Sequence, residues 1–201
     1  MLRPAAVCWF TCLIPGALLA QRPGFDLSGG LANHAGRAAI SALWSIRVGP
    51  LSLGAGPRLS AYQGGSQVFT RRAGSTADLP DTVLLDPSVV GVNAEVVGEL
   101  VLGGPVSLGA NLDLLGVAVG PTRRVAGNDF QPGHGSLFQY GNRDRGSLNS
   151  EFYVRLRVSG PWEVRGGVSH YVVGYTTSSA GGQGRYQRFQ TVPFVAITYR
   201  P

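Results

Sequence analysis

The sequence contains no lysine and few charges of any kind. All 17 basic residues are arginines, and charged residues make up 14% of the 201 residues. Nucleic-acid-binding surfaces need clustered basic side chains, so this sparse set predicts no nucleic-acid partner. The low charge also argues against an intrinsically disordered chain. The 30 glycines follow no period of three, which excludes a collagen.

Cysteines are confined to the first twenty residues, and no later stretch is apolar for long enough to form a membrane-spanning helix. Residues 1–20 have a positively charged start, an apolar stretch and a small-residue end, the layout of a secretory signal peptide. We expect cleavage after Ala20. An N-terminal membrane anchor is the alternative, which the break at Pro15 disfavours. Cleavage would remove Cys8 and Cys12 and leave no disulfide and no cysteine metal site.

Metal and cofactor sites have little support in the rest of the chain. His34, His134 and His170 are the three histidines, and none has a second ligand nearby at a metal-binding spacing. The glycine-rich stretches lack the lysine and the strand-to-helix context of a phosphate-binding loop. We therefore expect no metal and no cofactor.

From Gly24 onward the hydrophobic pattern repeats every second residue, which is the period of a β-strand. Eight such segments of about 10 to 14 residues follow one another, without a convincing helix. Three connections are tight Gly-Pro steps, at Gly49, Gly104 and Gly160. Three others are long and are expected to be loops, at about 64–88, 119–149 and 177–186. Because every second connection is tight, the chain is predicted to run up and down, with the tight turns at one end.

Charged residues share one face of the first seven segments. Six arginines and six acidic residues fall on the polar parity: Asp26, Arg37, Arg47, Arg58, Glu95, Glu99, Asp113, Glu151, Arg155, Arg157, Glu163 and Arg165. A narrow polar interior needs such a balance because each enclosed charge requires a partner, and the planar fork of arginine suits this pairing. We expect these residues to form an interior ion network and the apolar face to look outward. Eight strands enclose room only for side chains, which predicts no wide pore.

Three aromatic residues support an outward apolar face. Phe25, Trp162 and Tyr199 all lie on the apolar parity near the end that carries the tight turns. Aromatic residues gathered at one level are typical of the interfacial girdle of a membrane barrel.

The chain resembles the small eight-stranded outer-membrane β-barrel proteins of Gram-negative bacteria. Val195–Tyr199 alternates and closes on an aromatic residue, like the C-terminal insertion signal of that class, although Arg200 and Pro201 follow it here. The resemblance implies an all-β, eight-stranded antiparallel up-and-down transmembrane β-barrel over residues 21–201, located in the cell outer membrane. It also implies insertion by the barrel-insertion machinery, tight turns in the periplasm and long loops outside. Pro57 and Pro193, inside strands, should each mark a bulge or distortion.

The function expected from this resemblance is a structural or interaction role carried by the extracellular loops. The loops hold the basic pairs Arg71-Arg72 and Arg123-Arg124. These pairs could bind outer-membrane lipid through lipopolysaccharide phosphates, or they could simply keep the loops solvated. The sequence identifies no extracellular partner.

Two alternatives remain open at this stage. Ser150 and His170 share the apolar face of neighbouring strands and fall opposite each other, as in barrels that are lipid-modifying hydrolases or acyltransferases. A nucleophile also needs an acid behind its base, and no acid shares this face, so we expect no enzyme. The second alternative is a soluble secreted barrel that binds an apolar ligand inside.

Overall fold

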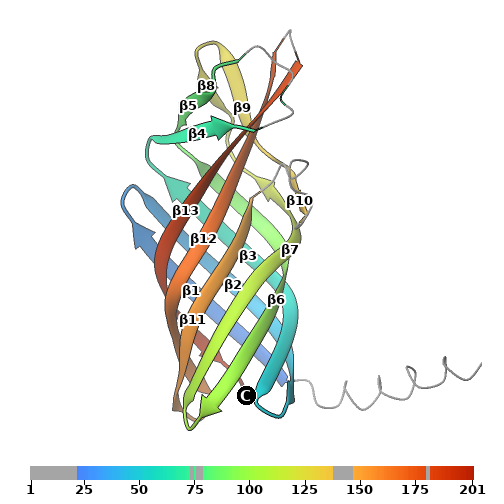
Figure 1. The fold of residues 1–201 in the computed structure, drawn as a ribbon, viewed down its shortest axis with the longest axis vertical. Coiled ribbons are helices and arrows are strands. Elements are labelled where there is room, and N and C mark those ends of the chain that lie inside the picture. The colour runs from blue at the N-terminus through green and yellow to red at the C-terminus, as the bar shows by residue number, and fades with distance from the viewer. Residues whose placement is uncertain (1–21, 73–74, 76–78, 138–146, 180–181) are drawn as a thin grey trace, which may run out of the picture.

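The structure is a closed antiparallel β-barrel. The computed structural model describes residues 22–72, 75, 79–137, 147–179 and 182–201, and the predicted signal peptide at 1–20 lies outside them. The ring consists of β1 (Arg22–Ala32), β2 (Ala35–Val48), β3 (Leu51–Gly64), β6 (Ser88–Gly103), β7 (Val106–Val119), β11 (Leu148–Ser159), β12 (Trp162–Ser179) and β13 (Gly182–Tyr199). It closes where β1 pairs with β13, Phe25 opposite Tyr199 (Figure 1). The predicted all-β, eight-stranded up-and-down barrel is confirmed. Among the described residues, no helix has the length and apolar character needed to cross a membrane.

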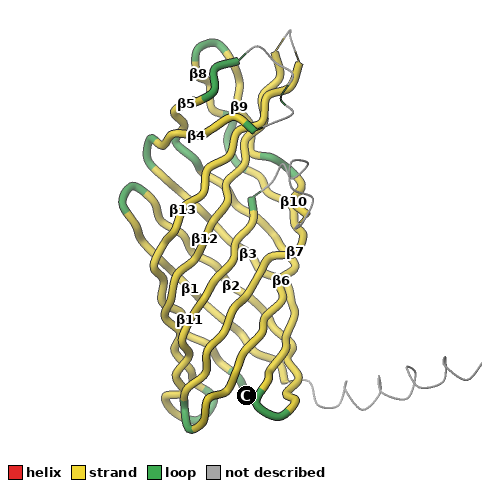
Figure 2. Tube along the Cα trace, viewed as in Figure 1, coloured by secondary structure: helices red, strands yellow, loops and turns green. Residues whose placement is uncertain are grey.

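The tight turns lie together at one end of the barrel, called the turn end here. Gly49, Gly104 and Gly160 have φ values of 60°, 57° and 51°. Glycine adopts positive φ without steric cost, and the proline that follows each one supplies a fixed negative φ, so the chain reverses within two residues. The opposite end rises well above the short β1–β2 hairpin, as Figure 2 shows.

The described parts of the long connections contain short strands, where the sequence predicted only loops. The segment at 64–88 contains β4 (Gln67–Arg71) and β5 (Thr82–Leu85). The segment at 119–149 contains β8 (Arg123–Val125), β9 (Asn128–Pro132) and β10 (Gly135–Leu137). The segment at 177–186 continues the β12–β13 hairpin, which pairs up to Ser179 and Gly182. Short strands interrupted by turn residues lack the long alternating runs that identified the barrel strands.

These extra strands build a cap on the barrel. We use "cap" for β4, β5, β8, β9 and the upper ends of β12 and β13. β4 pairs with β13, and β9 pairs with β12. Arg123 on β8 donates to the carbonyl of Asp86, just after β5, at 2.8 Å. The cap strands thus continue the sheet around the axis beyond the barrel strands (Figure 1).

An aromatic core fills the cap and the adjoining part of the barrel interior. Its largest members are buried tyrosines and phenylalanines: Tyr62, Phe69, Phe130, Tyr171, Tyr175 and Tyr186. Tyr62 stacks on Tyr171 with ring centroids 4.9 Å apart, and Phe69 meets Tyr175 edge-on at 5.4 Å. Among the described residues, the buried charged side chains of the lumen lie nearer the turn end than this aromatic core. The sequence predicted a charge-filled lumen and did not predict the aromatic part.

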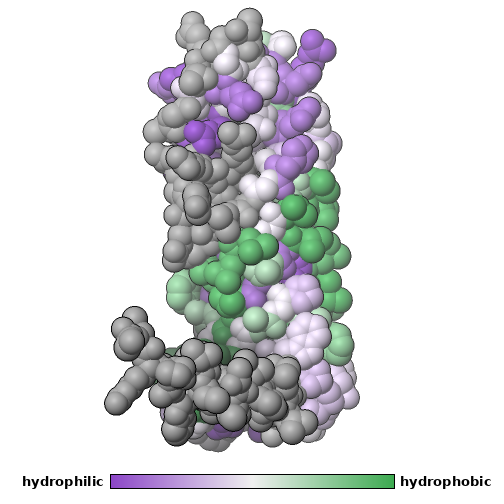
Figure 3. Space-filling view, turned by 90° about the vertical axis from the view of Figure 1, so that its right-hand side faces the viewer, coloured by the Kyte–Doolittle hydropathy of each residue, from purple (hydrophilic) through white to green (hydrophobic). Residues whose placement is uncertain are grey.

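The outer face of the ring is apolar. Large exposed hydrophobic residues occur on all eight barrel strands, among them Leu27, Ile40, Leu59, Val92, Leu108, Val154, Val164 and Ile197. Figure 3 shows hydrophobic residues gathered at mid-height, with hydrophilic residues toward the cap. A closed ring satisfies its backbone internally and shows lipid a hydrocarbon surface, which are the two requirements for crossing a bilayer.

The two strand prolines distort the ladders without forming bulges. At Pro57 the β2–β3 pairing skips Ala42 and Leu43, yet the register on either side is the same. At Pro193 the pairing of β13 with β1 has ended: Phe194, opposite Gly30, is the last residue of β13 that pairs with β1. A register shift occurs instead on β6, between Ala94 and Glu95, opposite β7.

The outward belt can be tested with two substitutions on one strand. Val154 and Val158 both face outward on β11, 44% and 64% exposed, but Val154 lies mid-strand and Val158 lies beside the turn. An arginine costs about 2–4 kcal/mol at the bilayer midplane and about 0–1 kcal/mol near the interface. We expect V154R to lower the urea midpoint of the lipid-embedded barrel strongly and V158R to leave it nearly unchanged. Equal effects would contradict the belt.

Candidate functional site

The centre of the lumen is organised around Arg58 on β3. Its guanidinium is fully buried and contacts three carboxylates, which come from three other strands. Its Nη2 lies 2.7 Å from Glu95 and 3.2 Å from Glu151, and its Nη1 lies 3.2 Å from Asp113. Arginine can serve three acceptors at once because its five N–H groups point outward in one plane.

Glu151 on β11 joins this centre to two more strands. Arg37 on β2 lies 2.5 Å from one carboxylate oxygen, and Arg165 on β12 lies 3.5 Å from the other. The amide of Asn111 donates to the same carboxylate at 2.6 Å. Side chains from four other strands, β2, β3, β7 and β12, therefore meet at Glu151. The buried arginines among them compensate the charge of the buried carboxylates.

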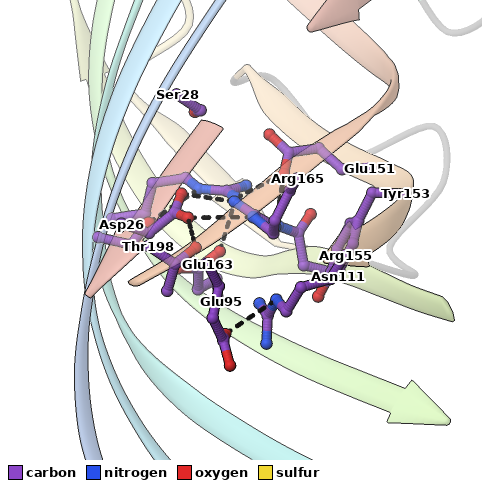
Figure 4. Close-up of polar contacts among 12 residues, drawn as sticks. Asp26, Ser28, Glu95, Asn111, Glu151, Tyr153, Arg155, Glu163, Arg165 and Thr198 are labelled. Carbon is purple, nitrogen blue, oxygen red and sulfur yellow. Dashed lines mark hydrogen bonds and ion pairs between the residues drawn. The ribbon is translucent and has the colours of Figure 1, made fainter. Parts of the chain in front are cut away.

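Arg165 also carries the network to the closure of the ring. It bonds Asp26 on β1 through two nitrogens, at 2.5 and 3.0 Å. Thr198 on β13 donates to the same carboxylate at 2.6 Å. Figure 4 shows these contacts between Asp26, Arg165 and Thr198. The first and last strands are thus joined by buried side-chain bonds as well as by their ladder.

A second group of charges lies closer to the turn end. Arg155 pairs with Glu99 and lies 3.5 Å from Glu163. Arg200 reaches the same two carboxylates, at 3.2 and 3.5 Å. The hydroxyl of Tyr153 donates to Glu99 at 2.7 Å.

Arg200 belongs to this group, although the sequence analysis does not include it among the network residues. It follows Thr198 at the strand period of two. That spacing indicates the same inward face and could have revealed it.

The structure places ten of the twelve expected network residues in the interior: Asp26, Arg37, Arg58, Glu95, Glu99, Asp113, Glu151, Arg155, Glu163 and Arg165. The prediction of a buried position was wrong for Arg47 and Arg157. Arg47 is exposed and donates to the carbonyl of Gly49, and the Arg157 side chain is 58% exposed, 3.7 Å from Glu163. Both lie close to the tight turns, where the polar face of a strand opens to solvent.

A vestibule opens at the turn end below the second group of charges. It has a volume of about 910 Å³ and is lined by Arg47, Arg157, Arg200, Ser52 and Glu163, among others. Beyond it, side chains occupy the described lumen, first the ion network and then the aromatic core.

Phe25, Trp162 and Tyr199 lie side by side on the outer face of three adjacent strands. Trp162 pairs with Tyr199 across β12 and β13, with ring centroids 5.0 Å apart, and Phe25 is the partner of Tyr199 on β1. Their position beside the turn end agrees with an interfacial girdle. Contact with lipid headgroups stays a prediction.

Ser150 and His170 are direct partners across β11 and β12. His170 nevertheless uses its Nδ1 to bond Thr191 on β13 at 2.9 Å, and its ring edge meets Phe152. No hydrogen bond joins the two candidates in the described structure. The neighbouring acid, Glu151, is held inside by the arginines. The arrangement lacks the base-to-nucleophile contact and the orienting acid that nucleophilic catalysis requires.

No group of three or more His, Cys, Asp or Glu residues in the described part of the chain is arranged to hold a metal ion. His134 is exposed in the connection that follows β9. In the cap, burial raises the pKa of Tyr175, whose oxygen accepts a bond from the Ser88 amide at 3.1 Å. This tyrosine is therefore a neutral packing residue at ordinary pH.

The network can be tested by removing its central charge. Changing Arg58 to Met removes the arginine that pairs with buried Glu95 and Asp113 and one of the three arginines around Glu151. Losing one side of a buried pair costs about 3–5 kcal/mol. We expect R58M to lower the urea midpoint in lipid vesicles accordingly. R157M, which removes a largely exposed arginine, should cost less than about 1 kcal/mol. Similar losses in both variants would show that Arg58 has no special role.

Comparison with known proteins gave likeness in structure only. No protein-family model matches the chain, and no curated protein matches it. The backbone structure of the Yersinia pestis outer membrane protein Ail in a phospholipid bilayer nanodisc matches at 10% identity and a TM-score of 0.40, over 90% of this chain and 99% of that one.

The crystal structure of the beta domain of the Bordetella autotransporter BrkA matches at 12% identity and a TM-score of 0.26, over 90% of this chain and 98% of that one. The closed eight-stranded ring of this chain, with its apolar outer belt and charged lumen, has the architecture of a transmembrane β-barrel.

Proposed function

We propose that the protein is a non-enzymatic outer-membrane barrel that acts through what its cap contacts outside the cell. The turn end and both chain ends then face the periplasm. The observation that carries the proposal is the occupied interior: buried ion pairs centred on Arg58 and Glu151, then the aromatic core around Tyr171. With the lumen closed, the folded cap is the surface available for function.

The cap is suited to binding because it is built as a continuation of the barrel. Phe69 of β4, Phe130 of β9 and Tyr186 of β13 pack in one core with the barrel residues. The Tyr186 hydroxyl also donates to the carbonyl of Pro80 at 2.7 Å. A surface fixed in this way loses little conformational entropy when a partner binds.

Folding into the membrane through the barrel-insertion machinery belongs to the same proposal. Val195, Ile197 and Tyr199 form the outward face of the last strand, alternating with buried Ala196 and Thr198. This alternation supports recognition of the strand as an insertion signal. Arg200, directed to the lumen by its pairing with Glu99 and Glu163, leaves the outward face of that strand apolar.

The two alternatives have less support. An inside-out pattern, with apolar residues such as Leu27 exposed and charges such as Arg58 buried, is the reverse of a soluble barrel around an apolar ligand. The lipid-modifying enzyme would depend on Ser150 and His170, and His170 is bonded to Thr191 instead.

A closed lumen predicts the absence of large channels. The folded barrel in a planar lipid bilayer should give no steps of the size expected from an open, water-filled pore, because eight strands enclose only their own side chains. Single-channel recording of the wild-type protein checks this result. Stable large steps from a folded preparation, verified by its heat-modifiable gel migration, would overturn the proposal.

The enzyme alternative predicts a chemical change that our proposal does not. We expect S150A and H170A to leave the outer-membrane lipid species of the expressing cells unchanged, as resolved by mass spectrometry. Loss of a lipid species in both variants, with barrel levels equal to wild type, would favour catalysis.

The role of the cap is tested in cells that lack the gene. A variant in which a short turn replaces Gln67–Leu85 removes β4 and β5 but keeps the eight barrel strands. We expect the wild type, and not this variant, to reverse the defect that deletion of the gene causes, when both proteins are inserted at equal levels. Full restoration by the variant would show that this part of the cap is dispensable.

A further inference from the structure

The vestibule at the turn end is lined by charged side chains, and the proposed function makes no use of it. Its volume is about 910 Å³, and its walls come from β2, β3, β6, β7, β11, β12 and the residues that follow β13. Glu99 and Arg155, which face into the lumen, form part of its lining. The vestibule therefore lies inside the ring of strands, away from the wall that faces lipid.

Arginine outnumbers carboxylate in this vestibule. Its ionisable lining residues are four arginines and two glutamates: Arg47, Arg155, Arg157, Arg200, Glu99 and Glu163. Four positive and two negative charges leave an excess of two, and a terminal carboxylate at Pro201, which also lines the cavity, would reduce this excess to one. The lining of the vestibule is positive in either case.

The two glutamates are already occupied by the deeper arginines. Glu99 pairs with Arg155 and lies 3.2 Å from Arg200. Glu163 lies 3.5 Å from each of the same two arginines. Both glutamate side chains are almost fully buried. They therefore offer little compensation to the arginines at the rim of the vestibule.

Arg47 and Arg157 form this rim, and both are exposed. Arg47 uses its Nε to donate to the carbonyl of Gly49 at 3.0 Å. The Nε of Arg157 lies 3.7 Å from Glu163, which is too far for a hydrogen bond. Among the described residues, neither arginine has a carboxylate within hydrogen-bonding distance. Their terminal N–H groups are therefore available to a solute.

The two rim arginines come from opposite sides of the mouth. Arg47 on β2 and Arg157 on β11 are four strands apart in a ring of eight, and each lies two or three residues before its tight turn. An eight-stranded ring is only wide enough for side chains, so long side chains from opposite walls reach a common centre. Guanidinium groups form paired hydrogen bonds with the oxygens of carboxylate or phosphate. An oxyanion between the two arginines therefore accepts hydrogen bonds from both sides.

We propose that the vestibule binds a small oxyanion with two negative charges, a phosphate or a dicarboxylate, held between Arg47 and Arg157 with Arg200 deeper in the cavity. Two charges are favoured because the ligand meets two separate guanidinium groups. The orientation proposed above makes the periplasm the source of this ligand. The site lies at the end of the barrel opposite to the cap, and the ion network closes the lumen beyond it, so the ligand is bound and not conducted.

The test uses the folded mature protein, labelled with ¹⁵N, in a zwitterionic detergent at low ionic strength. Phosphate, succinate and the singly charged acetate are titrated separately, with sodium chloride keeping the ionic strength equal. We expect phosphate or succinate to shift the Nε–H signals of Arg47 and Arg157 in a saturable way, and acetate to bind about fivefold or more weakly. Tighter binding of phosphate than of succinate identifies phosphate as the source, and the reverse order identifies a dicarboxylate. Both orders support the site.

R47Q and R157Q remove the two rim charges, and both arginines are exposed, so the variants should fold like wild type. Each should weaken binding of the preferred anion about two- to fivefold, which is the contribution of an exposed charged contact. The double variant should lose about the product of the two effects. R124Q is the matched control: Arg124 lies on β8 in the cap, and its side chain is 76% exposed. This variant should bind like wild type.

Several results would overturn the site. Shifts that grow without saturation, or equal binding of acetate, would indicate general charge screening. Unchanged binding in the double variant, or an equal loss in R124Q, would show that the rim arginines do not form the site. Heat-modifiable gel migration verifies that each preparation is folded.

The anion site and the proposed function are tested separately. The variant in which a short turn replaces Gln67–Leu85 should bind the anion like wild type, because no cap residue lines the described vestibule. A folded barrel that binds no anion at the turn end contradicts this site and leaves the proposed role of the cap standing.

Discussion

Pairing of buried arginines with carboxylates is the interaction on which the rest of this molecule depends. A ring of eight strands encloses too little space for its charges to keep their hydration, so each must find a partner inside. Arg58 and Glu151 meet this need by joining several strands at once. The Asp26–Arg165 pair extends the contacts from β12 across β13 to β1, where the ring closes. The same side chains that close the lumen therefore also connect the wall.

The charged lumen explains why the wall can be apolar and the cap can carry function. Once charge is satisfied inside, the outward faces are free to match lipid. Because side chains fill the lumen, solutes have no wide path through the barrel. Contacts with partners must therefore form outside the ring. The aromatic core around Tyr62 and Tyr171 continues the closure upward and fixes the cap strands to the barrel.

Strict alternation made the barrel strands predictable from the sequence. Each one-residue step along a strand reverses the side-chain direction, so Glu151, Tyr153 and Arg155 could be assigned to one face without coordinates. The tight turns were equally clear, because Gly49 and its counterparts require positive φ.

The cap was not predictable by this reasoning. Its strands are short, and β8 has only three residues. Their place depends on pairing with the distant β13 and on a core assembled from β4, β9 and β12, which no local period reveals. Arg47 and Arg157 are exposed because each lies close to a tight turn. Arg200 points into the lumen because it bonds Glu99 and Glu163, which are distant in the sequence. The pairing of Ser150 with His170 followed from register, but the turn of the histidine toward Thr191 did not.

A spin-label scan along β13 in lipid vesicles tests most directly which face of the strand contacts lipid. Both cysteines of the sequence lie in the predicted signal peptide, so single cysteines can be introduced from Phe189 to Thr198 without background. We predict that labels on the Val195 and Ile197 parity respond strongly to oxygen, which dissolves in lipid. Labels on the Val192 and Ala196 parity should respond weakly to oxygen and to a water-soluble relaxant. The reverse parity, or free access of the water-soluble relaxant to both faces, would contradict an inside-out barrel closed by its own charges.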